Sequence, residues 1–120
     1  MILDHVSLIV ADTARSLGFY KDLLGLELLE RPNLAFKGAW LDLGGVAALH
    51  LLELENPDPS VGRPEHGGRD RHIAFKVDDL PRIKERLSAA GYVISMSQSG
   101  RQALFCRDPD GNGVELIASK

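Results

Sequence analysis

The sequence predicts an α+β fold in which one βαβββ unit occurs twice. The main observation is an internal repeat, because residues 5–12 and 72–79 read alike when they are aligned 67 positions apart (72 − 5 = 67). Both segments alternate apolar with other side chains, as strands do, and both end at an aspartate that can cap a helix. A helical pattern and three short apolar runs follow each segment, which completes the βαβββ order.

The helix of each copy is predicted over 13–24 and 80–90. Apolar residues recur there at intervals of three and four, which places them on one face of a helix. These residues are Leu17, Tyr20 and Leu24 in the first copy and Leu80, Ile83, Leu87 and Ala90 in the second. Pro81 favours the first turn of the second helix, and a glycine, Gly25 or Gly91, ends each helix.

Three strands are predicted after each helix. They are expected near 26–31, 36–43 and 46–54 in the first copy and near 92–97, 102–107 and 113–118 in the second. Trp40 then corresponds to Phe105, and His50 corresponds to Glu115, at a spacing of 65 (115 − 50 = 65). The spacing falls from 67 to 65 because of two small deletions in the second copy, which loops absorb easily.

The 120 residues fit one domain, with the first copy at 1–56, a linker at 57–70 and the second copy at 71–120. The Pro and Gly content of the linker marks it as a loop. We expect a plain connection, with a cover over a site as the alternative. His66 lies in this loop, where we expect it to face solvent, and contact with a substrate is the alternative.

The composition narrows the class of protein. The net charge is −3, so no basic face for nucleic acid is expected. No apolar run approaches the roughly 18 residues that a membrane span needs, and the first residues do not read as a signal peptide. Cys106, the only cysteine, cannot form an internal disulfide and is expected to be a buried, inert thiol. These features together favour a soluble protein of the reducing cytoplasm.

Four residues with metal-ligand chemistry fall at equivalent positions of the two copies. His5 and His72 begin the first strand of each copy, and His50 and Glu115 lie on the last strand. Because strand residues alternate between faces, all four are expected on the face turned away from the helices. Imidazole and carboxylate are ligands that borderline divalent metals use. The sequence therefore predicts one metal site from these four residues, provided that the copies come together.

The alternative is that each of these histidines is hydrogen-bonded separately within a half-buried sheet. Three of the four histidines in the chain fall on the four equivalent positions, and a glutamate takes the remaining one. A strand histidine or glutamate without a partner is costly inside a sheet. Convergence on one ion explains all four positions at once, so we favour the metal site.

At these residues the chain resembles the vicinal oxygen chelate superfamily, which includes glyoxalase I, extradiol dioxygenases, fosfomycin-resistance thiol transferases and bleomycin-resistance proteins. The matching segments are 4–12, 16–26, 72–80 and 107–116, which read DHVSLIVAD, SLGFYKDLLGL, HIAFKVDDL and RDPDGNGVEL. The resemblance implies tandem βαβββ modules that form a curved mixed sheet around a metal cleft, the glyoxalase-like fold. In many relatives the paired modules come from two chains, so a homodimer with sites shared between chains is implied.

The resemblance also implies a small-molecule substrate and one divalent metal ion per site. The ligands leave the identity of the ion open among Zn, Ni, Fe, Co and Mn. The leading expectation is a lyase or isomerase of the glyoxalase type that acts through a metal-stabilised enediolate. Glu115, the only carboxylate of the set, is expected to carry the proton, and a role as a ligand alone is the alternative.

Other functions within the superfamily match parts of the ligand set. His5, His72 and Glu115 would supply the two-histidine, one-glutamate set of extradiol dioxygenases and fosfomycin-type thiol transferases. Glyoxalase I usually has glutamate or glutamine where this chain has His50. A non-catalytic module that binds an antibiotic is a third possibility, although bleomycin-binding relatives lack the metal ligands.

Three further residues, Ser7, Trp40 and Arg101, are candidates for lining the cleft and binding substrate. Surface or packing roles are the alternative for each of them. Residues 108–113 imitate the start of a calcium-binding loop. Because no glutamate stands at the last ligand position and no helices flank the segment, a β-turn before the last strand is expected instead.

Overall fold

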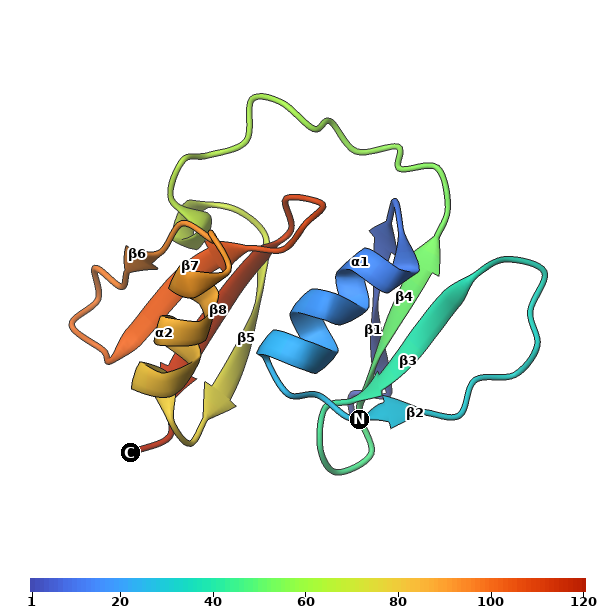
Figure 1. Cartoon of the computed structure of the whole chain (residues 1–120), viewed down its shortest axis with the longest axis horizontal. Coiled ribbons are helices and arrows are strands. Elements are labelled where there is room, and N and C mark those ends of the chain that lie inside the picture. The colour runs from blue at the N-terminus through green and yellow to red at the C-terminus, as the bar shows by residue number, and fades with distance from the viewer. The chain divides into compact units, whose positions relative to one another are not determined.

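The computed structural model describes residues 1–120 as two compact units, Met1–Asp58 and Pro59–Lys120. Each unit contains one four-stranded mixed sheet with a helix against it (Figure 1). The strand order is β1-β4-β3-β2 in the first unit and β5-β8-β7-β6 in the second, so the two sheets have the same topology. The predicted α+β class with two βαβββ modules is confirmed.

The first unit begins with β1 and a short helical segment, followed by three strands. Their bounds are β1 His5–Val10, α1 Thr13–Leu17, the π-helix η1 Gly18–Leu23, β2 Leu28–Leu29, β3 Gly38–Asp42 and β4 Ala48–Glu53. Strand β1 pairs in parallel with β4, and β4 pairs antiparallel with β3. The parallel pair is possible because the chain crosses over through α1 between the two strands.

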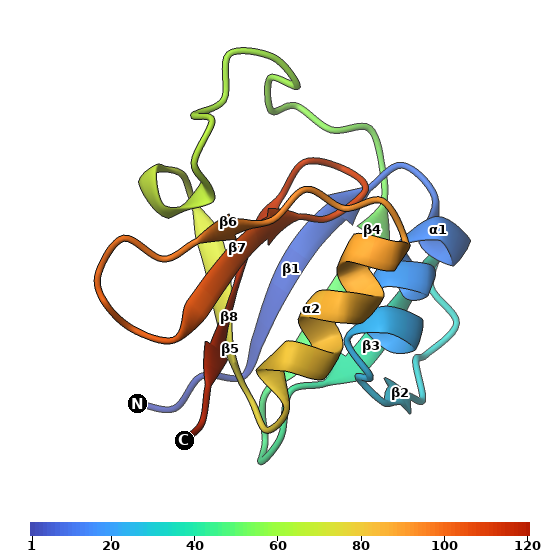
Figure 2. The same ribbon diagram turned by 60° about the vertical axis from the view of Figure 1, so that its left-hand side comes forward.

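The second unit repeats this order after a short 3-10 turn (Figure 2). Its elements are η2 Gly67–Arg69, β5 His72–Val77, α2 Leu80–Ala89, β6 Ser95–Met96, β7 Ala103–Arg107 and β8 Gly113–Ala118. Strands β5 and β8 are parallel, and β8 and β7 are antiparallel, as in the first unit. Strands β2 and β6 have two residues each, shorter than the apolar runs that predicted them.

Both helical segments begin at the predicted residue and end one residue before the predicted end, when α1 and η1 are taken together. The Asp12 side chain accepts a hydrogen bond from the backbone N–H of Arg15, and Asp79 does the same for Arg82. The helices are followed by Gly25 (φ +82°) and Gly91 (φ +90°) in a left-handed conformation that favours glycine.

One feature of the first helix differs from the prediction of a regular helix over 13–24. From Gly18 the helix widens, and the N–H of Leu24 bonds to the carbonyl of Phe19, five residues earlier. The neighbouring side chains of Phe19 and Tyr20 are both fully buried and meet edge to face at 4.8 Å. The wider turn lets both adjacent rings enter the core, where a regular helix would separate their directions.

The strand registers confirm that the two copies correspond residue by residue. Ser7 pairs with His50 in the first unit, and Ala74 pairs with Glu115 in the second. Across the antiparallel pair, Trp40 lies opposite His50, as Phe105 lies opposite Glu115. Residues that pair directly share a face of the sheet, so His50 and Glu115 occupy the same place in their respective sheets.

The core of each unit lies between the sheet and its helix. It consists of the strand residues that alternate with the candidate ligands, together with side chains from the helices. Fully or nearly fully buried members are Val10, Phe19, Tyr20, Leu41, Leu49 and Leu51 in the first unit and Leu87, Leu104, Val114 and Leu116 in the second. Burial alternates along β3 and β4, which confirms the predicted division into two sides in the first sheet; in β7 and β8 of the second sheet both sides are buried.

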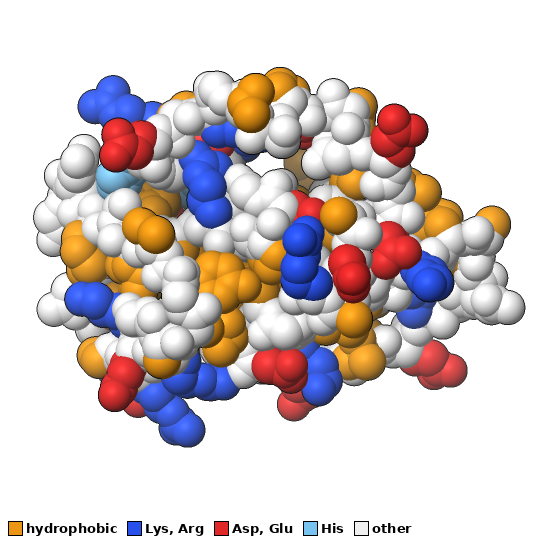
Figure 3. All heavy atoms as spheres, turned by 45° about the horizontal axis from the view of Figure 1, so that its top comes forward, with side chains coloured by type: hydrophobic (Ala, Val, Ile, Leu, Met, Phe, Trp, Pro, Cys, Tyr) orange, Lys and Arg blue, Asp and Glu red, His pale blue; other side chains and the backbone are white.

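The surface carries charges of both signs. On the face shown in Figure 3, Lys and Arg side chains are interspersed with Asp and Glu, in keeping with the net charge of −3. None of the helices is both long and apolar enough to cross a membrane.

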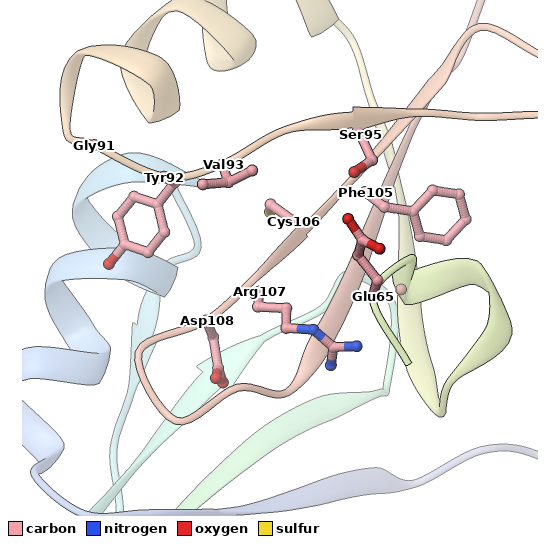
Figure 4. Close-up of a pocket in the computed structure, with 10 residues that line it drawn as sticks. Glu65, Gly91, Tyr92, Val93, Ser95, Phe105, Cys106, Arg107 and Asp108 are labelled. Carbon is pink, nitrogen blue, oxygen red and sulfur yellow. The ribbon is translucent and has the colours of Figure 1, made fainter. Parts of the chain in front are cut away.

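Cys106 is buried on β7, as predicted, and lines a pocket of about 340 Å³ together with Tyr92, Val93 and Phe105 (Figure 4). Burial raises the pKa of its thiol to about 12, and the charge of Asp108 adds to this shift. The thiolate is the reactive form, so the folded protein should protect this residue from alkylation.

We predict that iodoacetamide labels Cys106 at pH 8 on the order of 1000-fold more slowly in the folded than in the unfolded chain. The folded state keeps the thiol proton that the unfolded state loses, so stability should fall as pH rises from 9 to 12. Mass spectrometry of labelled protein and urea titrations across this range measure both effects. In Cys106→Ala the loss of stability between pH 9 and 12 that is due to the thiol should disappear. An unchanged dependence of stability on pH in this variant would contradict the raised pKa of Cys106.

Candidate functional site

The candidate ligands of the first unit lie on the sheet face opposite α1. His5 and His50 are stacked with their ring centroids 4.1 Å apart and their planes at 11°. Trp40 stacks on the other side of His50, with the ring centroids 4.2 Å apart and the ring planes at 4°. The register brings these rings together, since β4 pairs with both β1 and β3 and places His50 between them. The three rings thus form one column across the sheet.

The orientation of the His5 ring is fixed by the residue before it. Nδ1 of His5 lies 2.6 Å from Oδ2 of Asp4, and because a carboxylate can only accept, Nδ1 donates. The lone pair of the neutral ring is then on Nε2. Metal-ligating histidines commonly donate their other ring N–H to a carboxylate in this way, which fixes the tautomer and increases the basicity of the ligating nitrogen.

The surroundings of His50 favour the neutral state that a metal ligand requires. Burial lowers the pKa of its imidazole, and the neighbouring His5 ring and the Arg31 guanidinium lower it further, against an opposing effect of Asp4. Metal binding needs a deprotonated imidazole nitrogen, so a lowered pKa reduces competition from protons.

The candidate ligands of the second unit are already close to each other. Nε2 of His72 lies 3.3 Å from Oε2 of Glu115, whose side chain is almost completely buried. Oε1 of the same carboxylate accepts from Nη2 of Arg101 at 3.1 Å. Nδ1 of His72 lies 2.8 Å from the backbone carbonyl of Asp70 and must donate to it. In His72, as in His5, Nδ1 therefore donates to an oxygen, and Nε2 is directed at the partner ligand.

The Asp70 carbonyl is held in place by the side chain of the same residue. The carboxylate accepts from Nε and Nη2 of Arg63 at 3.0 and 2.9 Å and from Nη1 of Arg107 at 2.9 Å. Arg107 also donates to the carbonyls of Pro64 and Gly111. The Arg63 hydrogen bonds are the main reason why the pKa of Asp70 lies far below its usual range. This network ties the linker to β7 and fixes the chain just before His72.

We predict that Asp70→Asn loosens the His72 ring without unfolding the unit. Loss of the carboxylate charge weakens both guanidinium contacts, so the fraction of His72 with a protonated Nδ1 should decrease. Long-range ¹H–¹⁵N spectra measure this tautomer. His5, whose ring is held by Asp4 in the other unit, serves as an internal control and should not change; equal changes at both histidines would show that the effect is not local.

The donor groups fit a divalent cation of borderline character. Two ligands that each lie about 2.0–2.2 Å from one ion are roughly 3 Å apart, close to the spacing of the His72 and Glu115 atoms. A set of three imidazoles and one buried carboxylate suits zinc and its first-row neighbours. Within each unit the donors come as a pair, and no group of three His, Cys, Asp or Glu side chains gathers to hold an ion.

Comparison with known proteins agrees with these features. The family model described as "Glyoxalase/Bleomycin resistance protein/Dioxygenase superfamily" matches residues 2–116. The chain belongs to this superfamily.

The proteins that are similar to this chain include the following relative and two solved structures. A lactoylglutathione lyase of Haemophilus influenzae is 33% identical, with 97% of this chain and 91% of the relative aligned. The structure of an antibiotic-binding protein, TnmS3 from Streptomyces sp. CB03234, has a TM-score of 0.73 at 20% identity, covering 100% of this chain and 97% of that one. A variant of the fosfomycin resistance protein FosX from Listeria monocytogenes, in complex with Mn(II) and a dihydroxypropylphosphonic acid, has a TM-score of 0.77 at 21% identity, covering 100% and 95%. The last two show the shared fold.

The three candidate substrate-binding residues of this superfamily member all line pockets. Ser7 and Trp40 lie in a pocket of about 230 Å³ in the first unit, beside His5 and His50. Arg101 lies in a pocket of about 360 Å³ in the second unit, together with His72 and Glu115. Each pair of candidate ligands therefore opens onto a hollow within its own unit.

His66 is more constrained than the sequence suggests. It is half-buried, its Nδ1 accepts from the N–H of Gly68, and its Nε2 donates to the carbonyl of Met96. Its ring also lies 4.9 Å from that of Phe105. Both nitrogens are engaged, so His66 holds the linker against β6 and has no nitrogen left for a ligand.

Sequence reasoning did not identify Asp4, Asp70, Arg31 or Arg107. Asp4 could have been found from its place next to His5. Arg107 lies 37 residues from Asp70, so no local pattern reveals that pair. Arg31 bonds locally, to the carbonyl of Phe36, but a main-chain acceptor leaves no sequence signal. The calcium-like segment is a turn, as predicted, since the Asp108 carboxylate accepts from three groups of 110–112.

Proposed function

We propose that this protein is a divalent-metal-dependent lyase or isomerase of the glyoxalase type, with His5, His50, His72 and Glu115 as metal ligands. The proposal is supported most by the second unit, where His72 Nε2 and Glu115 Oε2 lie 3.3 Å apart and the other ring nitrogen is already bonded. Relatives named lactoylglutathione lyase support the reaction class. Because each unit supplies one pair, we propose that one ion takes both pairs, either from one chain or from two chains of a homodimer.

Glu115 is the proposed proton carrier. A bound divalent ion supplies Lewis-acid stabilisation of negative charge on a substrate oxygen. The carboxylate takes a proton from the hydroxyl-bearing carbon beside a substrate carbonyl and returns it to the carbonyl carbon, while the hydroxyl proton passes to the former carbonyl oxygen, so the isomerisation needs no oxidant. His50 stands where glutamate or glutamine is usual in glyoxalase I, so Glu115 performs both transfers alone.

Arg101 has a positioning role in this scheme. Its guanidinium binds Oε1 of Glu115, while Oε2 faces His72. When Oε2 leaves the ligand position to take up a proton, Oε1 stays anchored, so the carboxylate turns about a fixed oxygen. A buried carboxylate without this partner would be costly.

The test begins with protein purified without chelator, in which metal content is measured before and after dialysis against EDTA. Protein reloaded with Zn, Ni, Co, Mn or Fe(II) is then assayed with the hemithioacetal of methylglyoxal and glutathione. We expect bound metal, turnover, and loss of both in His5→Ala. Unchanged metal content in His5→Ala would sink the proposed ligand set. Oxygen consumption with a catechol, or glutathione addition to fosfomycin, would move the protein to another branch of the superfamily.

A second candidate function is small-molecule binding without turnover. The column formed by Trp40, His50 and His5 favours it, because stacked flat rings can bind a planar compound. Tight binding of an aromatic antibiotic by metal-free protein, with no turnover of any hemithioacetal, would identify this function.

A further inference from the structure

Arg31 is a half-buried cation without an anionic partner in the chain. Its only hydrogen bond runs from Nη2 to the carbonyl of Phe36, at 2.8 Å, and its guanidinium lies 5.2 Å from the Phe36 ring. Its Nε is buried and donates to nothing. Buried donors and buried charges are normally satisfied, so this arrangement requires an explanation.

The backbone below Arg31 is shaped to receive the guanidinium. A Cβ on Gly38 would lie 3.2 and 3.3 Å from Nη2 and Nε of Arg31, and 2.2 Å from the carbonyl oxygen of Leu51. The glycine therefore allows close approach of the strands and of the guanidinium at the same position. Gly38 belongs to the sheet face of Trp40 and His50, so Arg31 lies on the candidate-ligand side.

The surroundings of Arg31 form a pocket with one cationic end. The pocket of about 230 Å³ is lined by Arg31, by the aromatic residues Phe36 and Trp40, by Leu34, and by His5 and His50. No carboxylate lines this pocket, so nothing from the protein neutralises the guanidinium there.

We infer that this pocket binds an organic carboxylate that carries a flat apolar group. A carboxylate presents its two oxygens to the other end of the guanidinium, where Nη1 makes no hydrogen bond within the chain and is not buried, beside the second N–H of Nη2. The flat group of the ligand packs against Trp40 and Leu34. The inference depends on the proposed function only where it treats this ligand as the substrate. The pocket lies within one unit, and Arg31 can bind a carboxylate without a metal ion.

The experiment uses the full chain in EDTA, so that it does not depend on a bound metal. Trp40 is the only tryptophan and lines the pocket, so its indole signal in ¹H–¹⁵N spectra reports occupancy directly. Benzoate is the probe, and benzamide is its neutral match in shape. We expect benzoate to shift the Trp40 signal and to bind at least about tenfold more tightly than benzamide, as a charge-assisted pair requires.

Arg31→Gln should remove this preference, and Arg31→Lys should keep part of it. Arg82→Gln, on the exposed face of α2, makes the same change in net charge and should leave the preference unchanged. Equal binding of benzoate and benzamide, or a preference that survives Arg31→Gln, would overturn the inference. If Arg31→Gln disturbs the fold, Arg31→Lys replaces it as the test: a preference for benzoate that is weaker than in the unmodified protein supports the inference, and an unchanged preference overturns it. A protein that binds benzoate through Arg31 but takes up no metal would refute the proposed function alone.

Discussion

Glu115→Ala is expected to reduce affinity for divalent metal on the order of 100-fold or more, beyond the losses seen when only supporting residues are removed. Glu115 is the only acidic donor of the proposed set, and it is nearly completely buried. Its removal leaves the His72 and Arg101 side chains, both of which contact it, without a negative partner. Three neutral imidazoles then bind a doubly charged ion without any charge compensation.

Calorimetric titration of EDTA-treated protein with Zn or Co measures this affinity. Glu115→Gln separates charge from shape, because the amide retains the size of the side chain but has no negative charge; it should weaken metal binding nearly as much. Glu85→Ala, on the exposed face of α2, removes one negative charge elsewhere and serves as the control. If Glu115→Ala binds metal as tightly as Glu85→Ala, the ion is held by other groups and the four-residue site is wrong.

Phe19→Ala is expected to lower the free energy of unfolding by about 3–5 kcal/mol, the usual cost of deleting a buried aromatic side chain. Phe19 is completely buried and packs edge to face with Tyr20 in the widened part of the first helix. Because native domains are stable by only about 5–15 kcal/mol, this change removes a large share of the total.

Urea unfolding followed by circular dichroism gives the measurement. Leu28→Ala is a suitable control, since Leu28 is 51% exposed and its truncation should change the free energy of unfolding by less than about 0.5 kcal/mol. A cost for Phe19→Ala below about 1 kcal/mol would mean that the widened helix repacks around the loss.

The fold could be predicted well because its signals are local and occur twice. The period-two alternation in 5–10 and 72–77 determines which side chains face the helix, and the register of β4 and β8 follows once one face is buried. His5 and His50 had to share a face, and so did His72 and Glu115. Strand periodicity therefore placed both members of each donor pair on one face, and the parallel pairing of the first and last strands brings them together.

The contacts that refine the site could not be predicted in the same way. Arg31 precedes β3 by several residues, and its position over Gly38 depends on how the chain between β2 and β3 folds back. Asp70 and Arg107 meet because the linker returns to β7. The wide turn at Gly18 arises from the packing of two adjacent rings, which outweighs the preference for a regular helix.

The two histidines that begin the equivalent strands are oriented by different kinds of group. His5 relies on a side chain, that of Asp4, whereas His72 relies on a main-chain carbonyl. A single nucleotide change can replace an aspartate, but every residue type at position 70 would still supply a carbonyl. As homologous sequences diverge, the acceptor for His5 can be lost or changed by a mutation of Asp4. The acceptor for His72 remains as long as the backbone at position 70 keeps its conformation.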